Sequence, residues 1–206
     1  MTSEKQRMLA GELYIASDAE LVRDFKRART LTRQFNNSTE EDTEYRKNLL
    51  RELFAATGEN IHIEPPFRCD YGSQITVGEN FYANFDCIIL DVCEVKIGDN
   101  VMFGPRVHIF TAGHPIDAEV RNSQLEFGKP VTIGDNVWIG GNVVINLGVT
   151  IGNNTIIGSG AVVTKDIPPN VIAVGNPCKV LREITGEDKA YWFQKAAEYR
   201  AQMQRD

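Results

Sequence analysis

The stretch that decides the fold runs from residue 131 to residue 163 and reads VTIGDNVWIGGNVVINLGVTIGNNTIIGSGAVV. An aliphatic side chain returns at every sixth position of it. These anchors are Ile133, Ile139, Ile145, Ile151, Ile157 and Val163. A small or β-branched residue comes four positions after most anchors, as Val137 and Ala161 do. A period of six fits neither an amphipathic helix nor a simple alternating strand, and it is typical of a β-solenoid.

The same pattern extends toward the N-terminus. In-phase anchors are Ile97, Phe103 and Ile109, and an earlier set, offset by two residues, is Val77, Ala83 and Ile89. The offset predicts a bulge between Asp91 and Val95. One coil of such a solenoid cannot bury its apolar face alone, so we expect the core to form by stacking.

Between residues 114 and 130 the repeat is interrupted. This segment is mostly polar, and the gap from Ile109 to Ile133 is twenty-four residues, a multiple of six. We therefore expect the coil to resume in phase and the interruption to leave it as a loop. His114 stands at the root of this loop. Loops carried on a rigid scaffold are common places for functional residues.

Helical patterns flank the repeats. One helix is predicted to begin after Ser17, which forms a capping-box pattern with Glu20, and a second to run from Glu40 to Thr57. A third helical pattern occupies residues 187–204. The chain therefore divides into an N-terminal helical segment (1–58), a β-helix (59–185) with the loop 114–130, and a C-terminal helix (186–206).

The composition excludes several classes of protein. The net charge of −6 argues against a nucleic-acid binder, which would normally present a basic face. No apolar stretch is long enough to span a membrane, and the N-terminus lacks the apolar region of a signal peptide. We therefore expect a cytoplasmic protein. The four cysteines have no CxxC spacing and are expected to be buried thiols.

Several segments resemble one known family. They are the hexads, TAGHP in the loop, VTKDIPPNV after the repeats, MLAGELY near the N-terminus, and FRCDYG, FYANFDC and LDVC before the loop. Over about residues 5–185 they resemble the hexapeptide-repeat sugar O-acetyltransferases, most of all the maltose enzymes, with the galactoside and nodulation acetyltransferases as near relatives. The resemblance implies a mainly β fold, a left-handed parallel β-helix with three hexads in each triangular coil. It also implies transfer of acetyl from acetyl-CoA to a sugar hydroxyl of the maltose or glucose type, without a metal.

The chemistry of this reaction selects candidate residues. A hydroxyl is a poor nucleophile until a base removes its proton, and His114 is expected to be that general base. The resemblance implies that Asn84 stabilises the transition state, although coil corners also favour Asn for the turn alone. The expected sugar-binding residues are Asp18, Asp70, Tyr82 and Asp91. Asp18 could instead serve only the N-terminus of a helix.

The late coils are the expected binding site for coenzyme A. By resemblance, the pantetheine arm is held by Gly141, Ser159, Thr164 and Lys165, and the phosphates are met by Lys179 and Arg182. The alternatives are ordinary coil packing for the first four residues and a solvated basic face for the last two.

The resemblance also implies a homotrimer with each active site in a cleft between two subunits. His114 of one subunit would then face the late coils of its neighbour. The apolar side chains expected to point outward, where assembly would bury them, are Trp138, Phe81, Tyr82 and Met102.

Two other classes of function stay open at this point. The three histidines, His62, His108 and His114, are enough for a zinc site of the kind that β-helix carbonic anhydrases carry, although the flanking residues do not resemble that family. The other class is a non-catalytic scaffold. Among acetyltransferases, the acceptor could also be a galactoside, a lipo-oligosaccharide or a polysaccharide unit.

Overall fold

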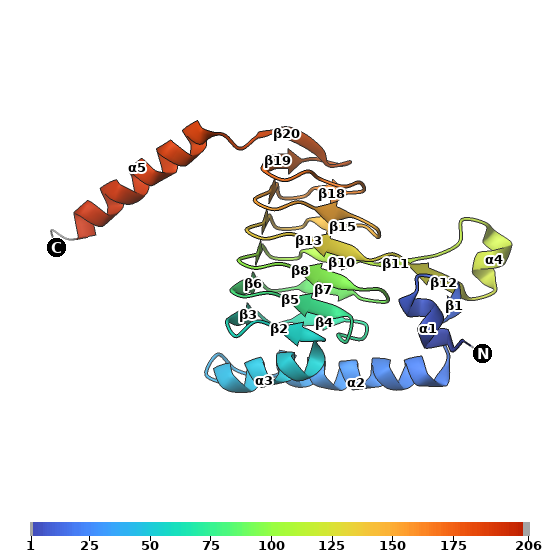
Figure 1. Cartoon of the computed structure of the whole chain (residues 1–206). Helices are drawn as coiled ribbons and strands as arrows, with labels where there is room; N and C mark the ends of the chain where they lie inside the picture. Colours follow the sequence, from blue (N-terminus) through green and yellow to red (C-terminus); the bar gives the residue numbers. More distant parts are fainter. Residues whose placement is uncertain (1, 204–206) are drawn as a thin grey trace.

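The computed structural model describes residues 2–203, so Met1 and residues 204–206, at the outer ends of the first and last predicted segments, lie outside the described residues. The middle of the chain is a left-handed parallel β-helix whose coils stack into a prism with three sheet faces (Figure 1). The fold class predicted from the period of six is confirmed.

Short strands build each face of the prism. Face one contains β2 (Ala56–Thr57), β5 (Ile75–Val77), β8 (Val95–Ile97), β13 (Val131–Ile133) and β16 (Thr150–Ile151). Face two contains β3 (Ile61–Ile63), β6 (Phe81–Ala83), β9 (Met102–Phe103), β14 (Trp138–Ile139), β17 (Ile156–Ile157), β19 (Val171–Val174) and the antiparallel β20 (Lys179–Glu183). Face three contains β4 (Phe67–Cys69), β7 (Cys87–Leu90), β10 (His108–Phe110), β15 (Val144–Ile145) and β18 (Val162–Val163).

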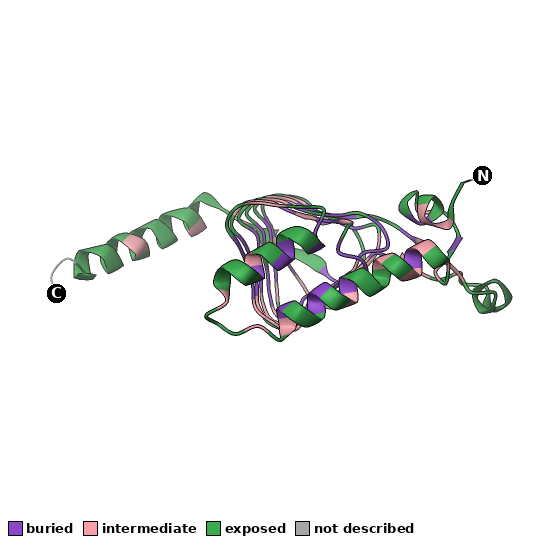
Figure 2. Ribbon diagram, turned by 90° about the horizontal axis from the view of Figure 1, so that it is seen from below, coloured by how far each residue is buried: buried purple, intermediate pink, exposed green. Residues whose placement is uncertain are grey.

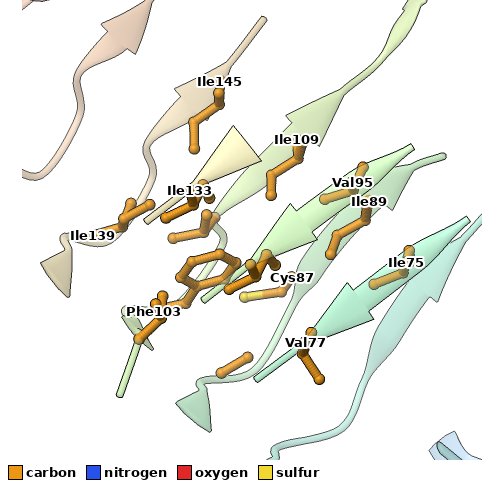
Figure 3. Packing of buried hydrophobic residues seen from close by; sticks show 14 of the residues in the cluster. Ile75, Val77, Cys87, Ile89, Val95, Phe103, Ile109, Ile133, Ile139 and Ile145 are labelled. Atoms are coloured by element: carbon orange, nitrogen blue, oxygen red, sulfur yellow. The ribbon is translucent and has the colours of Figure 1, made fainter. Parts of the chain in front are cut away.

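The predicted anchors form the interior of the prism. Every anchor from Val77 to Val163 is at most 3% exposed, and so are the small residues four positions later. Figure 3 shows several of them, among them Ile109, Ile133 and Ile145, pointing into one continuous core. Stacking of the coils therefore buries the apolar side chains that a single coil would leave exposed to solvent.

The edge between faces one and two explains the recurring Gly-Asp-Asn pattern. Its turns need left-handed backbone, supplied by Asn80, Asn100, Asn136, Asn154 and Asn170 with φ between 54° and 61°. The residues before these asparagines tie the coils together. The backbone N–H of Asp99 donates to Asp135 Oδ1 at 2.9 Å, and that of Asp135 donates to Asn153 Oδ1 at 2.9 Å. These Asx residues therefore serve the scaffold.

Early coils are longer than late ones. Val77 stacks on Ile97, twenty residues on, whereas Ile133 stacks on Ile151, eighteen residues on. The two additional residues lie where face three turns into face one. They occur at residues 91–94, where the phase offset predicts a bulge, and also at residues 70–73, which the offset does not indicate.

Two helices close the lower end of the prism (Figures 1 and 2). They are α2 (Ala19–Asn36) and α3 (Thr43–Leu53), whose buried faces join the core of the first coils. The prediction that Ser17 is the N-cap is wrong: Asp18 Oδ1 accepts from the backbone N–H groups of Glu20 and Leu21. The second helix was predicted too long, because Ala56–Thr57 instead pairs with β5 as the first strand of face one.

The interruption at residues 114–130 is not a plain loop. It contains α4 (Ala118–Asn122) and β12 (Leu125–Gly128). The latter lies between β1 (Tyr14–Ile15) and β11 (Ala112–Gly113) in a three-stranded antiparallel sheet beside the prism. A short helix, α1 (Glu4–Leu9), precedes β1.

The last described element is α5 (Gly186–Met203), which leads away from the upper end of the prism (Figure 1). None of its residues is buried (Figure 2). Among residues 2–203, no helix combines the length and the apolar character needed to cross a membrane.

Outward side chains on face two follow the prediction in part. Met102 and Trp138 are each 51% exposed, and Tyr82 is partly exposed. Phe81 was predicted to point outward, and this is wrong: it is 2% exposed, because it shares the inward parity of Ala83 on β6.

Candidate active site

A cavity of about 390 Å³ lies between face three, α2 and the three-stranded sheet. Its polar lining residues are Asp70, His114 and Glu126. Its aromatic lining residues are Tyr14, Phe25 and Tyr71, and its aliphatic ones are Ala16, Val22, Leu90, Val92 and Ala112. A concave site with aromatic walls and a few convergent polar groups is the ordinary form of a small-molecule site.

His114 reaches this cavity because β11 carries it off the prism. Ala112 pairs with Gly128 and Gly113 with Phe127, so the next row of the antiparallel ladder brings His114 opposite Glu126. His114 is exposed, and both residues also line a second, shallower cavity of about 200 Å³. His114 is therefore exposed, and it shares both cavities with the carboxylate-bearing Glu126.

The turn after His114 is held in shape. Arg121 Nη1 donates to the backbone oxygens of Pro115 and Ile116, both at 2.9 Å. Asp117 Oδ1 accepts from the N–H of Val120 at 3.0 Å and caps α4. Beyond this turn Ile116 is 98% exposed.

Asp70 forms the acidic wall of the cavity. Burial raises the pKa of its carboxyl to about 6, although Arg29, whose Nη2 lies 3.7 Å from Asp70 Oδ1, lowers it. The Arg29 guanidinium also lies 4.3 Å from the centre of the Phe25 ring. Asp70 and Phe25 thus share one cation, which links two walls of the cavity.

Asn84 lies at a different corner from His114. It follows β6 at the edge between faces two and three, where Gly104, Gly140 and Gly158 stack above it by register. We call this the Asn84 edge. Asn84 Oδ1 accepts from the N–H of Phe85 at 2.8 Å, and this hydrogen bond serves the turn.

The late-coil residues divide between two edges of the prism. Gly141 and Ser159 lie on the Asn84 edge. Thr164 and Lys165 follow β18, and His114 follows β10 and β11, so these three lie where face three meets face one, which we call the His114 edge. One chain therefore separates the predicted residues into two half-sites.

Some predicted residues are engaged elsewhere. Tyr82 lies on the outer surface of face two, where its ring stacks on His62 at 5.5 Å, away from the His114 cavity. Lys179 is exposed on β20, but Arg182 makes two hydrogen bonds to Asp188, at 2.6 and 2.9 Å. As an N-cap, Asp18 has one oxygen committed to α2.

The three histidines are not brought together. His62 lies on face two, His108 on face three and His114 on the His114 edge. In the part of the chain that the structure describes, no three His, Cys, Asp or Glu side chains are arranged to hold a metal ion.

Comparisons with known proteins match both halves of this architecture. Residues 7–58 match the maltose acetyltransferase hexapeptide capping motif, and residues 130–165 match the bacterial transferase hexapeptide model of six repeats. Galactoside O-acetyltransferase of Escherichia coli K12 is 49% identical over 91% of this chain and 93% of that protein. The chain belongs to the hexapeptide-repeat sugar O-acetyltransferases.

Two solved structures of this acetyltransferase family are similar along nearly the whole chain. A maltose O-acetyltransferase of Clostridium difficile 630 is 57% identical, covers 89% of this chain and 98% of that one, and has a TM-score of 0.88. A galactoside acetyltransferase in complex with coenzyme A is 48% identical, covers 92% and 94% of the two chains, and has a TM-score of 0.89.

Asp91, a predicted sugar-binding residue, lies inside the scaffold of this acetyltransferase. It is fully buried and does not line the cavity. Its Oδ1 accepts from the N–H groups of Asp70 and Tyr71 at 3.0 and 2.9 Å, and its Oδ2 from that of Gln74 at 3.3 Å. Asp91 therefore braces the two-residue insertion of the coil below, and it acts on the site only by holding Asp70 and Tyr71.

Asp91→Ala is expected to lower the free energy of unfolding by about 3–5 kcal/mol, because buried backbone N–H groups lose their acceptor. Asp91→Asn keeps one acceptor oxygen and should lose less. Urea unfolding followed by circular dichroism measures both. An unchanged urea midpoint in the alanine variant would show that Asp91 braces nothing.

The same carboxyl group should make stability depend on pH. Burial raises the pKa of Asp91 to about 7, above its ordinary value, so the folded state favours the protonated form. The cost of the buried charge is absent below about pH 4 and complete above about pH 7, so this contribution to stability falls as pH rises between them. Asp91→Asn should flatten that dependence.

Sequence reasoning missed several residues of this acetyltransferase site. Tyr14, Phe25, Tyr71 and Glu126 all line the cavity. Only MLAGELY, which contains Tyr14, and FRCDYG, which contains Tyr71, gave any signal, and those matches named no role for the tyrosines. The other two come from a helix face and from the interruption, where no spacing indicates chemistry.

Proposed function

We propose that this enzyme transfers acetyl from acetyl-CoA to a hydroxyl of a sugar of the maltose or glucose type, with His114 as general base. The observation that carries the proposal is the position of His114, exposed in the wall of a cavity with carboxylate and aromatic groups around it. Carboxylates accept hydrogen bonds from sugar hydroxyls, and aromatic rings cover the apolar faces of a sugar.

The proposed role of His114 is to take the proton of the acceptor hydroxyl as the hydroxyl oxygen attacks the thioester carbonyl. Such a base contributes roughly 10²–10⁴-fold to the rate. Asn84 would supply an N–H donor to the oxyanion that develops on the carbonyl oxygen. Its Oδ1 bond to Phe85 supports this, because the bond fixes the amide group in the turn.

We propose direct transfer without an acetyl-enzyme. The cysteines support this, because the four thiols are buried, and burial raises the pKa of Cys87, the thiol nearest Asn84 in sequence, to about 11. A thiol held protonated is a poor nucleophile.

The proposed path of the pantetheine arm follows the Asn84 edge past Gly141 and Ser159. There is open space beside Gly160 on this edge, because a Cβ added there would have no atom within 4 Å. Thr164 and Lys165 would approach from the His114 edge of a second subunit. Lys179 is free to meet phosphate, whereas Arg182 would have to leave Asp188.

A homotrimer would join the two half-sites. His114 and Asn84 flank face three at its opposite edges, so three copies around an axis beside face three would bring the His114 edge of one subunit to the Asn84 edge of the next. Exposed apolar side chains lie next to both edges: Ile116 beyond the His114 turn, and Met102 and Trp138 on face two, which meets face three at the Asn84 edge. They support contact of each edge with a neighbouring copy.

An acceptor screen tests the function. Purified protein with acetyl-CoA should release free thiol when maltose or glucose is added, with roughly equimolar acetylated sugar detected by mass spectrometry. Faster release with a galactoside, a lipo-oligosaccharide or a polysaccharide unit would move the proposal to that acceptor. No sugar-dependent release with any of them would refute it.

A further inference from the structure

Tyr14, Glu126 and His114 stand in one row across the three-stranded sheet. Tyr14 pairs with Glu126 in the ladder of β1 and β12, and the ladder of β12 and β11 brings His114 opposite Glu126. Directly opposed residues of neighbouring antiparallel strands have their side chains on the same face. All three side chains accordingly line the same cavity.

We propose that Tyr14 is a positioning residue that acts through Glu126 on His114. The Tyr14 hydroxyl donates a hydrogen bond to Glu126 Oε2 at 3.0 Å. This hydrogen bond fixes the carboxylate of Glu126 in the cavity that His114 also lines. From there its charge can stabilise the positive charge that forms when His114 takes a proton. The inference rests on the proposed role of His114 as general base.

The hydroxyl of Tyr14 is suited to this role because it remains a donor. Tyr14 is 1% exposed, and burial, followed by the charge of Glu126, raises the pKa of its hydroxyl well above the ordinary value. The group is therefore protonated throughout the pH range in which an enzyme of this kind works. A hydrogen bond from a neutral donor to a carboxylate is also stronger than one between neutral groups.

The position of Tyr14 is fixed by packing of its ring and by a hydrogen bond of the strand that carries it. Its ring packs with Met8, Leu21, Tyr71 and Val92 in a small cluster separate from the core of the prism. The strand that carries it is also tied to α1, because the N–H of Ile15 donates to Glu4 Oε2 at 2.7 Å. The segment before α2, which contains α1 and β1, therefore fixes Tyr14 in the position from which its hydroxyl reaches Glu126.

A double-mutant cycle tests the inference in the full-length enzyme. Tyr14→Phe keeps the ring and removes only the hydroxyl, and it should lower kcat about tenfold, the scale of one hydrogen bond to a charged group. The KM for acetyl-CoA should not change, because Tyr14 lines the His114 cavity and none of the residues proposed to hold coenzyme A lines it. Glu126→Met should lower kcat further, since it removes the carboxylate itself.

The decisive measurement is Tyr14→Phe in the Glu126→Met background. If Tyr14 acts through Glu126, the hydroxyl has no remaining effect there, and the double variant should equal Glu126→Met. Tyr45→Phe, which changes an exposed tyrosine of α3, is the matched control and should leave kcat unchanged.

Three results would overturn the inference. They are a normal kcat in Tyr14→Phe, a multiplicative loss in the double variant, and a parallel loss of kcat and thermal stability that marks only a packing role. The proposed function fails separately: it falls if His114→Ala stays active, whereas an inactive His114→Ala beside a normal Tyr14→Phe would refute the role of Tyr14 alone.

Discussion

His114→Ala is expected to lower kcat at least roughly 10²-fold, because the acceptor hydroxyl then has no positioned base to take its proton. The KM for acetyl-CoA should change little, since the imidazole lies in the wall of the acceptor cavity and the proposed pantetheine path runs along the coil edges. Steady-state kinetics with thiol release as the signal gives both constants.

His108→Gln is the matched control for this loss. It changes a histidine of β10 only six residues away that does not line the His114 cavity. It should retain kcat. Near-normal turnover in His114→Ala would refute the proposed role of His114 as general base. An acetylated cysteine trapped in the wild type or in a variant would refute direct transfer.

Two inactive variants mixed together should regain about a quarter of the wild-type activity if each site is shared between subunits. One variant is His114→Ala. The other is Asn84→Asp, which keeps the oxygen that accepts from Phe85 and so preserves the turn, but loses the N–H donors. In a randomly mixed trimer, a working site needs an intact His114 on one chain and an intact Asn84 on the next, each with a chance of about one half.

The two chains should be co-expressed with different affinity tags. Purification on both tags then selects the mixed trimers, in which one site in three has both groups, so about a third of the wild-type activity is expected after this selection. Sedimentation equilibrium should report three chains. Each variant alone is the control, because its sites all lack the same group. If the mixed assemblies are as inactive as their parents, or the wild type is a fully active monomer, both groups must act within one chain.

The local sequence pattern predicted the scaffold well because the same constraint recurs in every coil. An inward anchor at each sixth position and a left-handed Asn at a corner repeat along the chain, so a single misread coil cannot hide the period. The wrong predictions concern features that occur only once in the chain. Ser17 and Asp18 are adjacent polar residues that both fit an N-cap. Only the folded structure shows that the side chain of Asp18 accepts hydrogen bonds from the first turn of α2.

The candidate site was predicted less completely than the scaffold. The motif around His114 located the proposed base, and Asp70 does line the same cavity, whereas Asp91 holds the backbone of Asp70 and Tyr71. Sequence cannot separate these two acids. Both are aspartates in the two-residue insertions at the same edge, and their difference is burial, which depends on the coil stacked against each of them.

By itself, the sequence determined the period, the inward parity, the phase offset and the point at which the chain leaves the prism, because each follows from neighbours along one strand. Only the tertiary structure decided which residues share a site. Tyr14 and Glu126 are 112 residues apart, and they meet because β1 pairs with β12 beside the prism, a pairing that no local period encodes. The separation of Asn84 from His114 likewise comes from the corners of a closed coil, whose edges exist only once three faces have stacked around one core.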